Sequence, residues 1–361
     1  MKADQPIAGR VIKLITRTCQ ILPLLVAASA SSFVDPLDAP AEMSNLASST
    51  KLLAITSAGG RLVAAGPRGH ILYSDDQGDT WTQAQVPASV ALTDLRFATP
   101  ELGWAVGHSG LVLHTRDGGV TWERQVDGRQ TATDVLGFYE QMAAAGDDSA
   151  ALLREELSIN WQNGPEQPWL GVWFEDESHG FVVGPFGLIM ETLDGGDSWV
   201  PWMHRVDNPS VLHFNGIEQV DGVLYLPSER GLVFRKRGGE GKFVSLQTPY
   251  SGSFFGICGG GDLVLAYGLR GTVYASLDQG DSWARVDTGI GTALTGCTAL
   301  AGDQWISAAS GQVVRIGLNA GSVITSEGAR APWPLTALGA TSDRPVGVGF
   351  GGIWLGETQP Q

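Results

Sequence analysis

The chain has 361 residues, of which 43% are hydrophobic, 17% are charged and 49 are glycine. This composition allows a large core and favours short strands joined by tight turns, and it excludes a coiled coil or a disordered chain. The formal net charge is −15, and an acidic surface repels nucleic acid, so we exclude nucleic acid as a partner.

The first thirty residues are typical of a secretory signal peptide. A short apolar segment at 19–27 precedes three small residues at 28–30, and it follows the basic residues Lys2, Arg10, Lys13 and Arg17. The alternative is a retained anchor helix, but the apolar run is about half the ~20 residues that span a bilayer. We therefore expect a signal peptide at 1–30, a mature chain of 31–361, and a periplasmic or otherwise extracytoplasmic location.

A repeat then runs along the mature chain. Each complete copy contains Gly-x-x-Gly, an apolar strand, an Asp-x-Gly-x-Ser/Thr turn and a Trp, and the copies lie at 66–81, 107–122, 184–199 and 268–283. Weaker copies lie at 228–243, 308–318 and 349–357. Their spacing is about 41 residues, as between Gly69 and Gly110, which suits four short strands. Seven copies predict an all-β fold, a seven-bladed β-propeller that forms a single domain.

The Asp-x-Gly turn of each complete copy is an Asp box. Its Asp accepts hydrogen bonds within the turn, and its Trp packs between sheets. The predicted structural Asp-box residues are Asp75, Trp81, Asp117, Trp122, Asp194, Trp199, Asp278 and Trp283. The alternative, that these turns bind Ca²⁺, requires more convergent oxygen ligands than they offer. We predict no metal and no cofactor.

One interval between copies is about 36 residues too long, which predicts an insertion at about 127–165, between blades 2 and 3. We expect two helices there, at 131–146 and 147–162, and Leu153, Leu157 and Trp161 form one apolar stripe on the second. Two interpretations stay open: a hairpin that packs on its own blades, and a lid or partner-docking element.

The last copy of the repeat is incomplete. The chain ends too soon after Gly352 to supply a fourth strand, so we expect residues 33–49 to close the last blade as that strand.

Two cysteines remain after the signal peptide. For Cys258 and Cys297 we expect two buried free thiols on neighbouring strands, with a disulfide as the alternative. Neither cysteine has the ligand spacing of a zinc site.

With these repeats the chain resembles the photosystem II stability/assembly factor family of Asp-box propellers, built from bacterial neuraminidase (BNR) repeats, including its relatives in non-photosynthetic bacteria. The resemblance covers essentially all of the mature chain. It implies a non-catalytic propeller that helps membrane complexes to assemble. Plant and cyanobacterial members of the family use an arginine-rich face, whereas this chain is strongly acidic and carries the insertion.

Sialidases share the same repeats, so a sialidase-like enzyme is the alternative function, as a carbohydrate-binding or glycoside-hydrolysing propeller. A sialidase site needs three arginines, a Tyr with a Glu partner, and an Asp. Four of the six tyrosines fall on second or third strands, away from the channel: Tyr73, Tyr225, Tyr267 and Tyr274. Of the acidic residues near first strands, Asp94 stands alone and 175–177 lie in a polar loop. We predict no catalytic residue.

In a propeller, the turns between second and third strands share one face with the connections between blades. The residues that we predict to bind a partner there are Arg68, His108, Phe186, Arg230, Arg270, Trp169 and His213. Arginine and aromatic residues are favoured anchors of interfaces; the alternative is that arginine is only tolerated beside the turn glycine. We expect a monomeric binding platform, an assembly or accessory factor for a membrane protein complex or another envelope protein.

Overall fold

The computed structural model describes residues 1, 33–162, 164 and 166–358, so the predicted signal peptide lies outside the described residues except for Met1. Residues 35–361 form one compact unit, which contains every strand and helix that the structure describes. No helix in the described part of the chain is both long enough and apolar enough to cross a membrane.

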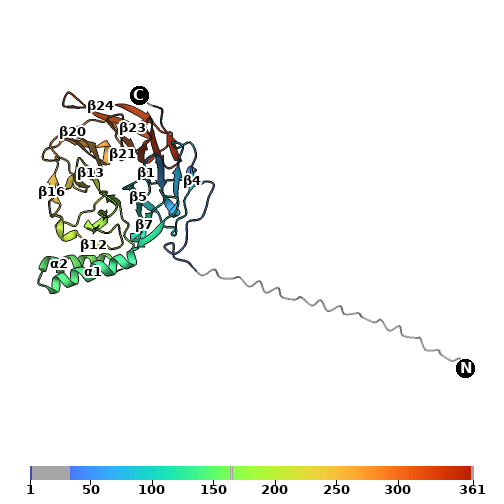
Figure 1. Cartoon of the computed structure of the whole chain (residues 1–361), viewed down its shortest axis with the longest axis vertical. Helices are drawn as coiled ribbons and strands as arrows, with labels where there is room; N and C mark the ends of the chain where they lie inside the picture. Colours follow the sequence, from blue (N-terminus) through green and yellow to red (C-terminus); the bar gives the residue numbers. More distant parts are fainter. Residues whose placement is uncertain (2–32, 163, 165, 359–361) are drawn as a thin grey trace. The chain divides into compact units, whose positions relative to one another are not determined.

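Seven antiparallel sheets follow one another along the chain and form a ring (Figure 1). Blade 1 contains β1 (Ala54–Ala58), β2 (Arg61–Ala65), β3 (Ile71–Ser74) and β4 (Thr82–Gln83). Blade 2 contains β5 (Leu92–Phe97), β6 (Gly103–Gly107), β7 (Val112–Thr115) and β8 (Glu123–Val126). Blade 3 contains β9 (Gly171–Phe174), β10 (Gly180–Val183), β11 (Ile189–Thr192) and β12 (Val200–Pro201).

The remaining blades continue the same order. Blade 4 contains β13 (Glu218–Val220), β14 (Val223–Pro227), β15 (Leu232–Lys236) and β16 (Val244–Gln247). Blade 5 contains β17 (Phe254–Gly260), β18 (Leu263–Gly268), β19 (Val273–Ser276) and β20 (Ala284–Val286). Blade 6 contains β21 (Leu294–Leu300), β22 (Asp303–Ala308), β23 (Gln312–Asn319) and β24 (Ser322–Arg330), and blade 7 contains β25 (Leu335–Ala340), β26 (Pro345–Gly349) and β27 (Gly352–Leu355). The predicted seven-bladed propeller is confirmed.

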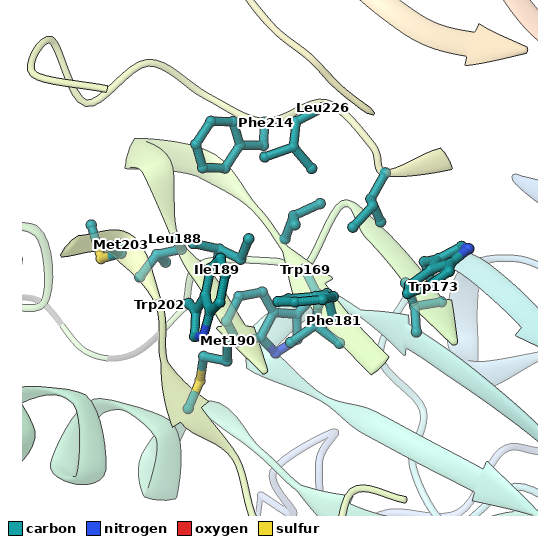
Figure 2. Close-up of a cluster of buried hydrophobic side chains, with 14 of the residues drawn as sticks. Trp169, Trp173, Phe181, Leu188, Ile189, Met190, Trp202, Met203, Phe214 and Leu226 are labelled. Carbon is teal, nitrogen blue, oxygen red and sulfur yellow. The ribbon is translucent and has the colours of Figure 1, made fainter. Parts of the chain in front are cut away.

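The second strands of the blades are deeply buried. Every residue of β6, β10, β14 and β18 is buried, because these strands lie inside a sheet that neighbouring blades cover on both faces. Their near-continuous apolar sequences, such as GWAVG in β6, reflect this two-sided burial. The largest core cluster joins blades 2 to 4 around Trp169, Trp173, Phe181 and Trp202 (Figure 2).

The insertion forms the predicted helical hairpin, α1 (Gly128–Ala144) and α2 (Asp148–Asn160), which lies beside β12 in Figure 1. The Asp127 and Asp147 carboxylates cap the two helices by accepting backbone N–H groups of the first turn. Val135, Tyr139 and Leu157 are buried in the same cluster as the tryptophans of blade 3. The hairpin therefore packs on its own blades.

The Asp boxes have the predicted role with one correction in register. In blade 1 the turn is built by Asp76 and not by Asp75: the Asp76 carboxylate accepts from Ser74 Oγ (2.8 Å), Thr80 N (2.8 Å) and Thr80 Oγ1 (2.5 Å). Asp117, Asp194 and Asp278 accept the equivalent bonds in their blades. Asp75 lies one residue earlier and pairs with Arg61 at 2.7 Å. The working Asp is the one five residues before the Trp.

Each Asp box is also tied to the preceding blade. The carbonyl of the residue after the box Asp accepts a hydrogen bond of 2.7–3.0 Å from a side chain of that blade. The four bonds run from Arg344 to Gln77, Arg61 to Gly118, Gln125 to Gly195 and Arg235 to Gln279. The boxes therefore join neighbouring blades as well as closing their own turns.

The expectation that residues 33–49 add a fourth strand to blade 7 is wrong. All of these residues are described, none is in a strand, and the sheet of blade 7 has three strands. Part of the segment lies against blade 1 instead, where Ala41 N donates to Val86 O (3.0 Å), while the 3₁₀ helix η1 (Ala47–Ser49) contacts β27. The ring closes through its inner strands, since β1 contacts both β5 and β25.

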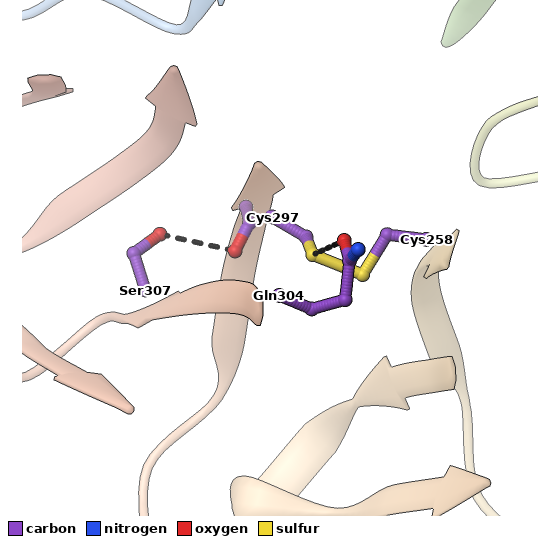
Figure 3. The surroundings of a disulfide bond; sticks show 5 residues. Cys258, Cys297, Gln304 and Ser307 are labelled. Atoms are coloured by element: carbon purple, nitrogen blue, oxygen red, sulfur yellow. Dashed lines mark hydrogen bonds between the residues drawn. A yellow bond between two sulfur atoms is a disulfide. The ribbon is translucent and has the colours of Figure 1, made fainter. Parts of the chain in front are cut away.

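The expectation of two free thiols is also wrong, because Cys258 and Cys297 form a disulfide (Figure 3). Cys258 lies on β17 and Cys297 on β21, so the bond links the inner strands of blades 5 and 6. Their Cα atoms are 6.3 Å apart, and they are separated by 39 residues in sequence, about one repeat. Two cysteines at nearly the same position of successive repeats are brought side by side by the stacking of blades.

Candidate functional site

The turns between second and third strands line one face of the ring. Four of them are 3₁₀ turns: η2 (Pro67–Gly69), η3 (His108–Gly110), η4 (Pro185–Gly187) and η6 (Leu269–Gly271). The turn glycine donates to a connection between blades, as Gly69 N does to Val90 O (2.8 Å) and Gly110 N does to Gln167 O (2.9 Å). These bonds place the turns and the connections on the same face, which we call the rim face.

Three arginines stand out on the rim face. Arg68, Arg230 and Arg270 each precede the turn glycine, have φ between 56° and 61°, and are exposed. Among the described residues no carboxylate forms an ion pair with any of them, whereas most other arginines of the chain are paired. Three unpaired guanidinium groups, carried at equivalent turn positions with positive backbone φ, are available to bind an anionic group.

A groove of about 400 Å³ lies beside one of these arginines. Its walls include Arg270 and Arg285, both exposed, together with Tyr250 and Tyr274. The Tyr250 hydroxyl donates to Leu269 O at 3.4 Å. Two unpaired guanidinium groups next to two phenol rings provide bidentate donors and aromatic contact area in one place.

The other predicted rim residues divide into surface and core. His108 is exposed, and Phe186 and His213 are half-buried against each other, where Phe186 N donates to His213 Nδ1 (2.8 Å). Trp169 is 2% exposed, and its Nε1 donates to Gly110 O at 3.1 Å. The prediction that Trp169 faces a partner is wrong, because its indole fills the core beneath the hairpin.

The centre of the ring holds a cavity of about 570 Å³, lined mainly by first strands. Its lining contains three charged residues, Asp94 and Arg96 on β5 and Glu218 on β13. Arg96 Nη1 lies 3.3 Å from Glu218 Oε1. The Asp94 carboxylate instead accepts Leu95 N (2.9 Å) and Val172 N (3.0 Å).

The protein around the channel changes the protonation of these groups. Burial raises the pKa of Asp94 to about 7 despite its two backbone donors, and the nearby charge of Glu218 adds to the shift. Burial also raises the pKa of Glu218, although Arg96 opposes the shift. Both carboxylates therefore lie where a negative charge is poorly solvated.

The placement of Tyr267 away from the channel is wrong. Tyr267 is on β18, a second strand, but it lines the cavity. Its partner on β17 is Gly256, and a Cβ at Gly256 would lie 2.1 Å from the tyrosine hydroxyl. The phenol can cross the inner strand only because Gly256 has no side chain, so it reaches the channel, which Tyr225, the other tyrosine on a second strand, does not line.

Sequence reasoning missed the channel, although one signal was present. Asp94 follows a register shift in its strand pair, at the position that Gly256, Gly296 and Ala337 occupy in blades 5, 6 and 7. An aspartate at a small-residue position of the repeat is unusual enough to have been singled out. No group of three or more His, Cys, Asp or Glu residues in the described part of the chain could hold a metal ion.

The fold matches solved propellers along most of its length. The structure titled "YCF48 bound to D1 peptide" aligns with a TM-score of 0.61 and 13% identity, over 87% of this chain and 95% of that one. YCF48 from Cyanidioschyzon merolae aligns with a TM-score of 0.57 and 15% identity, over 89% of this chain and 98% of that one. At these identities the likeness concerns the fold alone.

Sequence relatives are assembly proteins matched over part of their length. The photosystem II assembly protein Ycf48 of Synechococcus sp. is 26% identical over 187 residues, which cover 47% of this chain and 51% of the relative. The photosystem II assembly lipoprotein Ycf48 of Trichormus variabilis is 37% identical over 83 residues, or 22% of this chain and 23% of the relative. The chain thus matches about half or less of these curated relatives.

The family model described as "Photosynthesis system II assembly factor YCF48" matches residues 74–136 and 155–312. The two matched segments leave out residues 137–154 inside the insertion, and they run from the end of β3 in blade 1 to the start of β23 in blade 6. They cover more than half of the chain, and this protein therefore belongs to the YCF48 family of photosystem II assembly factors.

Proposed function

We propose that the protein is an exported, non-catalytic propeller that binds a membrane protein complex, or another envelope protein, as an assembly or accessory factor. The observation that carries the proposal is the three unpaired arginines Arg68, Arg230 and Arg270 at equivalent turn positions on the rim face of an acidic protein. Membership of a family of assembly factors supports the same role. One solved propeller of the same fold is described as bound to a D1 peptide, and a peptide segment is the kind of partner that we propose for the rim face.

The charge of the protein restricts how such a partner is held. At a net charge of −15 the long-range field opposes an anionic partner, and salt screens it beyond about 8 Å. At contact, each rim guanidinium can bind a carboxylate or phosphate through two parallel hydrogen bonds. Binding through the rim face is therefore short-ranged, and it depends on the planar shape of the guanidinium as well as on its charge.

Export is part of the proposal. The Cys258–Cys297 disulfide is of the kind that persists in an oxidising compartment, and two relatives carry the word lipoprotein in their names. Fractionation of cells that express the full chain should recover it outside the cytoplasm, with an N-terminus at about residue 31 by mass spectrometry. Recovery of the uncleaved chain from the cytoplasm would show that the export part is wrong.

The rim-face proposal is tested by pull-down from detergent-solubilised membranes. The variant Arg230→Ala/Arg270→Ala should lose most of the recovered membrane protein, and Arg230→Lys/Arg270→Lys should lose part of it. The matched control is Arg116→Ala/Lys242→Ala, which removes two exposed cations from the turns between third and fourth strands. If the control loses as much partner as the arginine variant, the effect is one of net charge and the rim face is not the binding surface.

A second candidate, a glycoside-hydrolysing propeller, is favoured by the channel. Tyr267, Glu218 and Asp94 line one cavity, and a sialidase site needs these three residue types together. The described lining contains Arg96 as its one arginine, however, where such a site uses three to hold a carboxylate. Hydrolysis of a fluorogenic sialoside by the protein, abolished by Tyr267→Phe, would establish this function; the assembly-factor proposal expects no turnover.

A further inference from the structure

The channel has an unbalanced charge that the rim-face function does not use. With both carboxylates ionised, Asp94, Glu218 and Arg96 sum to one negative charge inside a ring of protein. The Arg96–Glu218 pair at 3.3 Å uses the one guanidinium of the described lining. Asp94 therefore has backbone donors but no cationic partner.

The third polar group of the site is a phenol hydroxyl. Tyr267 is 7% exposed, and its hydroxyl has no hydrogen-bond partner among the described residues, although it lines the cavity. The charges of Glu218 and Asp94 both contribute to raising its pKa, after burial, so the three side chains lie within electrostatic reach of one another. Tyr267 is thus an unpartnered polar side chain, more than nine-tenths buried, whose hydroxyl reaches the cavity that the two carboxylates line, and it can accept a hydrogen bond from a ligand there.

We propose that the central channel binds an alkylammonium group, held by Asp94, Glu218 and the hydroxyl of Tyr267. An ammonium carries three N–H donors, and the site offers three acceptors: one oxygen of each carboxylate and the phenol oxygen. Its single positive charge balances the single excess negative charge. The group can come from a free primary amine or from a lysine side chain of a partner.

Other ligand classes fit the site less well. A divalent cation needs more oxygen ligands than two carboxylates, one of which is already paired, and no suitable group of three acidic or histidine residues was found in the described residues. An anion would meet two carboxylates and one guanidinium. A guanidinium ligand is planar and forms two parallel bonds, whereas these acceptors come from three different blades around the channel.

Without a cation, the site takes up a proton. The pKa of Asp94 is raised to about 7, chiefly by burial and also by Glu218, with Arg96 opposing the shift, so near neutral pH a fraction of the molecules carries Asp94 as the neutral, protonated acid. A bound ammonium replaces that proton as the balancing charge. This makes the site selective for a cation with N–H donors over a neutral molecule of the same shape.

The test is calorimetric titration of the full mature protein at pH 8 with n-butylammonium chloride, and with n-butanol as the neutral isostere. We expect saturable binding of one butylammonium and none of butanol. Asp94→Asn should weaken binding at least tenfold, and Tyr267→Phe should weaken it several-fold. The matched control Asp221→Asn removes one exposed carboxylate at a turn with φ of 49°, which asparagine tolerates, and should bind as the wild type does.

The source of the ammonium is separated by a second titrant, N-acetyl-lysine N-methylamide. Binding of both titrants indicates a site open to a partner's lysine, and binding of butylammonium alone indicates a free amine. Non-saturable titration, or equal binding by wild type and Asp94→Asn, would overturn the proposal, as would Ca²⁺ binding with the same dependence on Asp94 and higher affinity. If Asp94→Asn does not fold, Tyr267→Phe decides alone, and unchanged binding there overturns it. These outcomes are independent of the rim-face pull-down.

Discussion

Arg235 provides a sharp test of how the blades are held together. It lies on β15 of blade 4, is 5% exposed, and its Nη1 donates to Gln279 O and to Asp281 Oδ1, both at 2.7 Å, in the Asp box of blade 5. Arg235→Met keeps most of the side-chain volume and removes both bonds. Both bonds are donated by the charged guanidinium, and a hydrogen bond that involves a charged group contributes about 1.5–3 kcal/mol. Because the buried guanidinium also costs desolvation free energy, we expect a net loss of about 2–3 kcal/mol in the free energy of unfolding.

The assay is urea unfolding at 25 °C, followed by tryptophan fluorescence. The matched control is Arg237→Met, because Arg237 Nη2 contacts the same Asp281 carboxylate at 3.3 Å but is about one third exposed. An ion pair of that kind contributes at most about 1 kcal/mol, so the control should shift the urea midpoint much less. An Arg235→Met variant with the wild-type urea midpoint would refute the idea that the boxes tie neighbouring blades together.

Three further predictions follow from other contacts in the structure. Asp76→Ala should lower the melting temperature clearly and Asp75→Ala only slightly, by scanning calorimetry, and the reverse order would contradict the corrected register. Hydrogen bonds to Glu191 and Glu175 raise the pKa of His179. The protonated imidazole therefore stabilises the fold below pH about 6.5, and this stabilisation is lost as the pH rises through the raised pKa. His179→Gln should reduce the difference in the free energy of unfolding between pH 6 and pH 8. Reduction of the Cys258–Cys297 bond, which closes a loop of about 40 residues, should cost about 3–4 kcal/mol in urea unfolding, and a Cys258→Ser/Cys297→Ser variant should not respond to reductant.

The sequence was sufficient for the fold because the repeat is local. Each copy carries its own strand pattern, turn glycine and Asp box within about 41 residues, so blades can be counted without knowing any contact between them. The turn positions follow as well: the residues before Gly69, Gly231 and Gly271 lie at equivalent exposed places on the rim face. The helical hairpin was predicted from its apolar residues and, for the second helix, from its Asp cap, since those signals are also local.

Two predictions were wrong for different reasons: the exposure of Trp169 on the rim face, and the choice of Asp75 as the Asp-box residue of blade 1. Trp169 was placed on the surface because it begins a first strand, but the hairpin contributes to the cluster that buries it, and a contact between distant segments leaves no local trace. The choice of Asp75 instead of Asp76 was an error of one residue. In the other boxes the Asp lies five residues before the Trp, and this spacing would have identified Asp76.

The channel and the disulfide were decided by the tertiary structure alone. Asp94 and Glu218 come from blades 2 and 4, and only closure of the ring brings their strands to one cavity. Tyr267 reaches that cavity because the opposing residue on β17 is Gly256, and the cysteines meet because blades 5 and 6 are neighbours. Repeats determine which element each residue belongs to, since strand and turn preferences act over a few residues. Which side chains share a site depends on how complete blades pack, and packing joins residues that the chain keeps far apart.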